Sequence, residues 1–202
     1  MAEEAPSVSP TRRRLLLLAP AAVLAVGLAG AGAWLLSAEE PPVPIGGPFR
    51  LQDGTGRTVT EQDFRGRWTL VYFGYTHCPD ACPMALQNMA NAMDLLPPGL
   101  RERVALLFIT VDPERDTPAV VRDYVSAFHA PITGLSGTPE QVVQVLRAYR
   151  VYAAKAPGKE GDYTVDHSSI LYVMDPRGRF AANLTHEAPP ERIAERLKAL
   201  AG

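Results

Sequence analysis

Cysteine is nearly absent from this sequence, which has only Cys78 and Cys82 among its 202 residues. A folded region of about 160 residues buries enough surface to be stable without disulfides. A bridge between two such close positions would remove little chain entropy from the unfolded state. We therefore expect the pair to serve chemistry, with an inert structural disulfide as the simpler alternative.

An excess of charge of either sign is also absent. The 20 basic and 22 acidic side chains give a formal net charge of −2 at pH 7. Proteins that bind nucleic acids usually present a basic face, so the charge balance gives no reason to expect a nucleic-acid partner. Histidine is scarce as well, with four residues, which leaves few candidates for a metal ligand.

One long run without charge is present, at residues 15–36. A helix of this length would cover about 33 Å, close to the hydrocarbon core of a bilayer. Three arginines precede it, and the positive-inside rule places the preceding residues in the cytoplasm. We predict a cytoplasmic segment at 1–14 and a transmembrane helix at 15–36. The chain would be single-pass in the cell inner membrane, with its C-terminal domain on the periplasmic, non-cytoplasmic side.

A cleaved signal segment is the alternative interpretation of residues 15–36. The apolar core of a signal peptide is usually shorter than this run, but Ala31, Gly32 and Ala33 could form a cleavage site. Both interpretations predict export of the residues that follow. Residues 37–48 are rich in proline and glycine and predict a semi-rigid linker, and 49–202 predict one folded domain.

The domain has the pattern of an α/β fold. Residues 68–75 and 104–111 are almost continuously apolar and β-prone, which is typical of strands buried on both faces. A hairpin is expected at 49–60 and further strands at 170–174 and 180–184. Helices are expected at 80–95, 117–128, 138–149 and 190–200, two of them opened by Thr-Pro pairs that suit a helix start. This order predicts a thioredoxin-like central mixed sheet flanked by helices.

Both cysteines lie in the segment 74–83, GYTHCPDACP, between the first buried strand and the next helix. Pro83 has no N–H and is tolerated only in the first helical turn, so we expect Cys78 just before the helix and Cys82 in its first turn. The helix dipole and free N–H groups there favour thiolates. The spacing is one residue longer than the C-x-x-C of disulfide oxidoreductases. The sulfurs could form a disulfide or spread around a soft ion such as Cu(I).

A third metal ligand is expected from histidine, and His167 is the best placed. It lies in the sequence 166–169, DHSS, directly before the strand at 170–174, so we expect it in a loop beside the sheet, facing the cysteines. Thioredoxins place a cis-proline in this loop, and an imidazole there instead favours metal binding. Asp166 is a candidate hydrogen-bond partner of the ring. His77, His129 and His186 are expected to have other roles.

The segment 75–83, YTHCPDACP, resembles the signature of the Sco/SenC family, copper-binding proteins that assist assembly of cytochrome c oxidase. Further similar motifs follow in the family's order: 111–118 (VDPERDTP), 134–138 (GLSGT), 148–152 (AYRVY) and 165–169 (VDHSS). The resemblance covers about residues 49–178. It implies a thioredoxin-like fold, a single N-terminal anchor, and one copper ion, Cu(I) or also Cu(II), bound by Cys78, Cys82 and His167.

Two functions of different classes are compatible with these residues. The first is a copper metallochaperone, not strictly an enzyme, that gives copper to the copper-bearing subunit of cytochrome c oxidase or to another copper chaperone. The second is a membrane-anchored thiol–disulfide oxidoreductase acting on the acceptor's cysteines, in which Cys78 attacks a disulfide and Cys82 resolves the intermediate. A peroxidase would need an arginine beside Cys78, which the sequence does not place.

Two other expectations concern metal identity and the charged motif. Zinc is compatible with the residue types, but a closed structural zinc site would need a fourth ligand that the sequence does not offer. The charged residues at 112–116 are expected to form a solvated loop.

Overall fold

The computed structural model describes residues 44–158 and 162–202. The predicted cytoplasmic segment 1–14, the predicted transmembrane helix 15–36 and most of the linker 37–48 lie outside these residues. Among the helices that are described, none has the length and apolar character needed to cross a bilayer.

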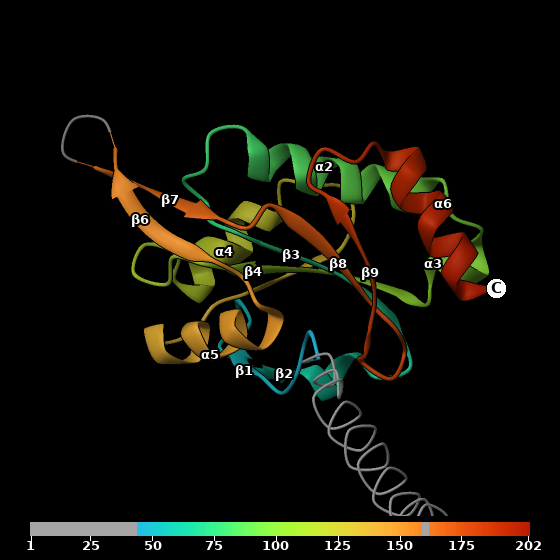
Figure 1. Cartoon of the computed structure of the whole chain (residues 1–202), viewed down its shortest axis with the longest axis horizontal. Helices are drawn as coiled ribbons and strands as arrows, with labels where there is room; N and C mark the ends of the chain where they lie inside the picture. Colours follow the sequence, from blue (N-terminus) through green and yellow to red (C-terminus); the bar gives the residue numbers. More distant parts are fainter. Residues whose placement is uncertain (1–43, 159–161) are drawn as a thin grey trace, which may run out of the picture. The chain divides into compact units, whose positions relative to one another are not determined.

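A five-stranded mixed sheet forms the centre of the domain (Figure 1). Its strands run in the order β5–β4–β3–β8–β9, with β3, β4 and β5 parallel and β8 and β9 antiparallel. Their bounds are β3 (Trp68–Gly74), β4 (Val104–Thr110), β5 (Ile132–Leu135), β8 (Ile170–Met174) and β9 (Phe180–Thr185). Every residue of β3 and β4 is buried, which confirms that these runs are central strands.

Helices cover both faces of the sheet. On one face α2 (Ala81–Asp94) packs against α6 (Pro190–Ala201), and α4 (Pro118–Val125) contacts β5. On the other face lie α5 (Pro139–Tyr149) and the small antiparallel pair β1 (Arg50–Gln52) and β2 (Thr58–Thr60). The short helices η1 (Glu61–Phe64) and α3 (Pro98–Arg101) complete the elements. The predicted mixed sheet flanked by helices is therefore confirmed.

The helix starts follow the predicted capping chemistry. Thr117 Oγ1 accepts from the N–H of Val120 at 3.4 Å, and α4 begins at Pro118. Thr138 and Gln141 form a reciprocal capping box at the start of α5. These contacts satisfy free N–H groups, so the helices begin where the sequence indicates.

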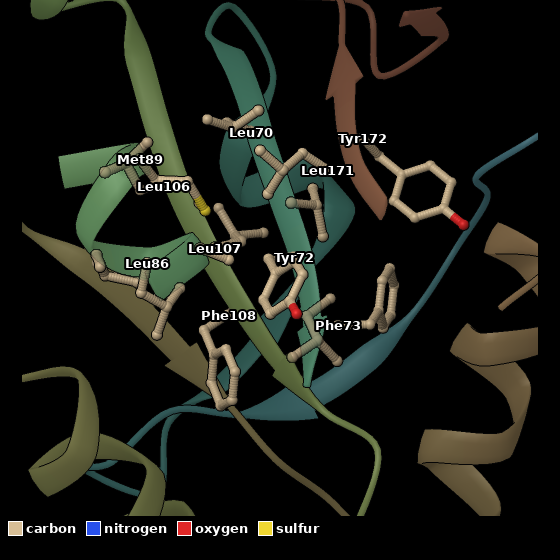
Figure 2. Packing of buried hydrophobic residues seen from close by; sticks show 14 of the residues in the cluster. Leu70, Tyr72, Phe73, Leu86, Met89, Leu106, Leu107, Phe108, Leu171 and Tyr172 are labelled. Carbon is tan, nitrogen blue, oxygen red and sulfur yellow. The ribbon is translucent and has the colours of Figure 1, made fainter. Parts of the chain in front are cut away.

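The apolar core shows how alternation along β3 divides the two faces (Figure 2). Tyr72 pairs with Phe108 of β4 and Leu171 of β8, and its ring packs near that of Phe108. The next residue, Phe73, packs against Tyr149 of α5 on the opposite face. Residue 72 therefore lies on the face that also receives Cys82 of α2, since its hydroxyl contacts that sulfur.

The sequence interpretation was wrong about the region before β8. A separate antiparallel ribbon, β6 (Ala153–Pro157) with β7 (Tyr163–His167), stands outside the central sheet. His167 is the last residue of β7, not part of a loop. The alanine, lysine and proline of β6 have low strand propensity, so the pair was missed although β7 alternates apolar and polar residues. The short strand β5 was missed for a similar reason, because it has four residues and contains glycine.

Candidate metal centre

The two cysteines lie where β3 ends and α2 begins, as predicted. Cys78 is half-buried before the helix, and Cys82 is the second residue of α2 and fully buried. The N–H of Cys82 lies 3.3 Å from Cys78 Sγ and donates to it. A free donor at the helix start is therefore directed at the more exposed sulfur, where it favours negative charge. Both thiols are unbridged.

His167 completes a three-residue group at this position. Its Nε2 lies 3.7 Å from Cys82 Sγ, although the two residues are 85 positions apart. Its Nδ1 lies 3.2 Å from the carbonyl oxygen of Ser168. Because a carbonyl oxygen only accepts, we assign the proton to Nδ1. The lone pair of Nε2 then faces the sulfur.

Asp166 does not take the predicted position beside the ring. Its side chain is exposed on β7, and the hydrogen bond that orients the imidazole goes to the Ser168 carbonyl instead. Alternation along a strand explains the difference, since residues 166 and 167 point to opposite faces. The sequence had suggested a loop, for which no alternation is expected.

The two sulfurs have opposite protonation preferences. The hydrogen bond from the Cys82 thiol lowers the pKa of Cys78 to about 4, with further support from the Cys82 N–H against the opposing effect of burial. The same contact and burial in the helix raise the pKa of Cys82 well above its usual range. At neutral pH, Cys78 is a thiolate and Cys82 a thiol that donates to it.

The three side chains are neighbours but not a finished coordination shell. Within residues 44–158 and 162–202, no group of three or more His, Cys, Asp or Glu side chains is arranged to hold an ion. Cys82 and His167 face each other, whereas Cys78 Sγ is engaged with the Cys82 N–H. The assignment of all three as metal ligands therefore stays a prediction.

Gly74 leaves room for the buried sulfur. A Cβ at this last position of β3 would lie 2.7 Å from Cys82 Sγ, 2.9 Å from Phe108 Cε2 and 3.0 Å from Tyr72 Cε1. Side chains are not found at such separations, so a larger residue here would displace the sulfur. No local pattern in the sequence indicates this role, because the contact with Cys82 Sγ forms only when α2 packs on the sheet.

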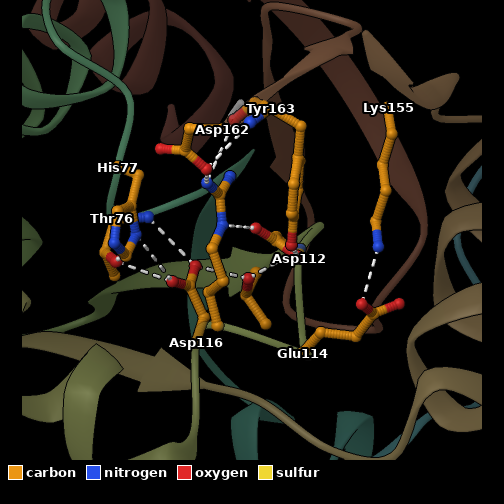
Figure 3. A network of polar contacts seen from close by, with 10 residues as sticks. Thr76, His77, Asp112, Glu114, Asp116, Lys155, Asp162 and Tyr163 are labelled. Carbon is orange, nitrogen blue, oxygen red and sulfur yellow. Dashed lines mark hydrogen bonds and ion pairs between the residues drawn. The ribbon is translucent and has the colours of Figure 1, made fainter. Parts of the chain in front are cut away.

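A buried carboxylate holds the loop that carries Cys78 (Figure 3). Asp116 is fully buried and accepts from the Thr76 N–H at 2.9 Å and from Thr76 Oγ1 at 2.6 Å. Thr110 Oγ1 donates to the same carboxylate at 2.7 Å. Asp112 is also buried, at 2% exposure. The prediction of a solvated loop at 112–116 is therefore wrong for both aspartates, because their charges are satisfied by internal donors.

The same loop is connected to the ribbon that ends in His167. Asp112 accepts from the Tyr163 hydroxyl at 2.8 Å and from Arg115 Nε. The Arg115 guanidinium lies 3.7 Å from the centre of the Tyr163 ring and donates to the Tyr163 carbonyl. It also lies 5.7 Å from the ring of Tyr75, which meets His167 edge-on. The sequence held one signal for the part that residues 112–116 play in the site. They directly follow a buried parallel strand, and ligands favour this edge of a sheet.

The other three histidines have different environments. His129 lies 3.0 Å from Asp94, and His186 lies 4.0 Å from Glu187. His77 is half-exposed, with Nδ1 3.1 Å from Thr76 Oγ1. Of the four, His167 is therefore the one that contacts a cysteine sulfur among the described contacts.

The sheet order, the cysteine-bearing helix start and the facing histidine define a thioredoxin-like protein with a two-cysteine, one-histidine site. The profile described as SCO1/SenC matches residues 37–202. The chain therefore belongs to the SCO1/SenC family.

Individual relatives agree with this membership. The chain is 47% identical over 136 residues to "Protein SCO1 homolog 1, mitochondrial" of Arabidopsis thaliana, covering 67% of this chain and 41% of that protein. It is 46% identical over 142 residues to the human "Protein SCO1 homolog, mitochondrial", covering 67% and 46%. The chain thus spans less than half the length of these two relatives.

A solved structure is similar over nearly its whole length. The structure of Bradyrhizobium japonicum ScoI with copper bound is 45% identical to this chain, with a TM-score of 0.71. The match covers 77% of this chain and 99% of that one. The match thus includes nearly all of that structure and about three quarters of this chain.

Proposed function

We propose that this protein binds one copper ion through Cys78, Cys82 and His167. It then delivers the ion to the copper-bearing subunit of cytochrome c oxidase or to another copper chaperone. The observation that carries this proposal is the 3.7 Å separation of Cys82 Sγ and His167 Nε2, with Cys78 four residues before Cys82. Two sulfurs with one imidazole form a donor set that suits Cu(I). The copper-bound structure of the Bradyrhizobium japonicum relative supports the same ion.

The observed separation fits one ion between these two atoms. Metal–sulfur and metal–imidazole bonds of about 2.3 and 2.0 Å, the lengths known for zinc, would hold the donors about 3.7 Å apart around a trigonal ion. Cys78 would complete the set when its sulfur turns from the Cys82 N–H toward the ion. Its thiolate form at neutral pH needs no proton loss to bind.

Delivery follows from the unequal exposure of the three donors. Cys82 is fully buried and Cys78 half-buried. An incoming cysteine or histidine of the acceptor would replace Cys78 first, while Cys82 and His167 still hold the ion. Copper would then pass by ligand exchange without being released to solvent.

Copper titration of the full reduced chain tests this proposal. We expect one equivalent of Cu(I), measured by competition with a coloured chelator. Cys78→Ser, Cys82→Ser and His167→Ala should each lower the affinity by more than about 100-fold, since even the hydrogen-bond partners of ligands contribute 10–100-fold. The control is His129→Ala, whose side chain pairs with Asp94. Equal affinity of His167→Ala and the parent would overturn the ligand assignment.

A second function is favoured by the protonation difference of the cysteines. The Cys78 thiolate would attack a disulfide of the acceptor, forming a mixed disulfide and releasing one acceptor thiolate. Cys82 would then attack Cys78 Sγ, which releases the second acceptor thiolate and leaves a Cys78–Cys82 disulfide. An external dithiol would be needed to reduce the pair again. In this role His167→Ala should keep its exchange rate within a few-fold, while Cys78→Ser should lose it.

We also propose that residues 15–36 anchor the domain to the inner membrane, with residues 1–14 in the cytoplasm and 49–202 on the periplasmic side. The uncharged run and the arginines before it support this arrangement. The test is alkaline extraction of membranes followed by intact-mass measurement. Retention with the full mass supports an anchor, and a soluble product that has lost about residues 1–33 supports a cleaved signal segment.

A further inference from the structure

Tyr72 is a buried polar side chain in contact with the candidate site but outside the donor set. It lies in the central strand β3, is fully buried, and its hydroxyl lies 3.8 Å from Cys82 Sγ. Its ring meets that of His167 edge-on, with centroids 6.1 Å apart. One side chain thus contacts two of the three proposed ligands.

The hydroxyl has a reason to use the sulfur as its acceptor. Burying a hydroxyl without a partner is unfavourable. Phe108 and Leu171 lie beside Tyr72 in the strand pairing (Figure 2), and the polar groups that its hydroxyl meets are Cys82 Sγ and the Ser169 side chain. A phenylalanine would fill the same volume without needing a partner. Tyrosine therefore adds a hydroxyl with two partners at this position, and of these Cys82 Sγ belongs to the proposed donor set.

The strand fixes this hydroxyl more firmly than the ribbon fixes His167. Tyr72 lies in β3, which is paired in the sheet on both sides, with β4 and with β8. His167 ends β7, which pairs only with β6 in the sheets of the described residues. The Tyr72 hydroxyl is therefore a fixed donor that can hold Cys82 Sγ toward the imidazole, even if the ribbon of β6 and β7 shifts the position of His167.

We propose that Tyr72 is a positioning residue of the copper site, whose hydroxyl donates to Cys82 Sγ. The bond orients the sulfur toward His167 and stabilises the negative charge that the sulfur carries as a metal ligand. This assignment rests on the proposed copper binding and adds a fourth residue to its machinery. The sheet provides a matched control in Tyr172, which is also buried, at 3% exposure, but packs on the opposite face against Phe73 and Tyr149.

The test compares Tyr72→Phe with Tyr172→Phe in the full chain. Each substitution removes one hydroxyl from the core. We expect Tyr72→Phe to weaken Cu(I) binding about tenfold, the effect of one hydrogen bond to a charged group. Loading with Cu(II) gives a second measurement. The sulfur-to-copper charge-transfer band should move to lower energy in Tyr72→Phe, because the thiolate loses its donor, and should not move in Tyr172→Phe.

Three other outcomes are decisive. Parent-like affinity and an unmoved band in Tyr72→Phe would overturn the assignment. Equal losses in both variants would also overturn it, since the effect would then belong to core packing. If the parent chain binds no copper, the proposed function fails first and this assignment falls with it. The first two outcomes therefore refute the role of Tyr72 alone, and the third refutes the proposed function.

Discussion

The N–H of Thr76 donates to the buried carboxylate of Asp116 across 40 positions of sequence, at 2.9 Å, and the Thr76 hydroxyl donates to the same group at 2.6 Å. Thr76 lies two residues before Cys78, so this carboxylate holds the loop that leads to the half-buried cysteine. The loop after β4 thereby takes part in building the site at the end of β3.

Replacing Asp116 by asparagine should destabilise the domain. The amide has no charge and its nitrogen cannot accept, so the buried donors from Thr76 and Thr110 would lose the charge-assisted hydrogen bonds that the carboxylate gives them. We expect the free energy of unfolding to fall by about 2–3 kcal/mol, measured by urea denaturation. Asp123→Asn is the control, because that carboxylate is 68% exposed, and a surface change of this kind should stay within about 0.5 kcal/mol. Equal stability of the two variants would contradict the anchoring role.

Replacing Gly74 by alanine should disturb the buried sulfur. The new methyl group would lie 2.7 Å from Cys82 Sγ, and overpacking of this kind costs about 1–3 kcal/mol. We expect both lower stability and weaker Cu(I) binding. Gly99→Ala is the matched control, since a Cβ there meets nothing within 4 Å. A Gly74→Ala protein with the parent's stability and affinity would show that the sulfur moves freely.

Alkylation of the metal-free chain should be selective and depend on pH in one direction. The pKa of Cys78 is lowered to about 4, so its thiolate is present above that pH and is lost as the pH falls through it. The pKa of Cys82 is raised, so that thiol stays protonated at neutral pH. Iodoacetamide should modify Cys78 at a nearly constant rate from pH 6 to 8, and more slowly near pH 4, as followed by peptide mass spectrometry. A rate that rises tenfold per pH unit up to about pH 8.5, as for an ordinary thiol, is the contrary result.

Replacing Tyr163 by phenylalanine should loosen the connection between the ribbon and the loop. The buried carboxylate of Asp112 would lose a donor at 2.8 Å and keep only the Arg115 guanidinium on its side-chain oxygens. We expect a loss of about 1–2 kcal/mol in the free energy of unfolding. Faster amide hydrogen exchange should appear in β6 and β7. Tyr152→Phe is the control, because that residue is 63% exposed; matching losses in both variants would reject the connection.

Most of the central architecture could be predicted from local sequence patterns. Continuous apolar strands and Thr-Pro helix starts act through neighbouring residues, so β3, β4 and α5 begin where the sequence indicates. The ribbon of β6 and β7 could not be predicted this way. Its strands are held by pairing with each other and by contacts from Arg115 and Asp112, which are distant in sequence.

The charged residues at 112–116 also could not be placed correctly from local sequence patterns. Asp112 and Asp116 have the composition of a surface turn, and burial of a carboxylate is normally unfavourable. Donors from Thr76, Thr110 and Tyr163 reverse that expectation, and these donors come together only after the chain has folded.

The sequence by itself determined the position of Cys78 and Cys82 at a helix start, because a proline in the first turn and a buried strand before it are local constraints. It also indicated His167 as the partner and the family to which the chain belongs. Only the tertiary structure decided that His167 ends a strand, that its ring is held by Ser168 rather than Asp166, and that Tyr72 and Asp116 support the site. The physical reason is distance along the chain: capping and periodicity act within a few residues, whereas these contacts join segments that only the folded sheet brings together.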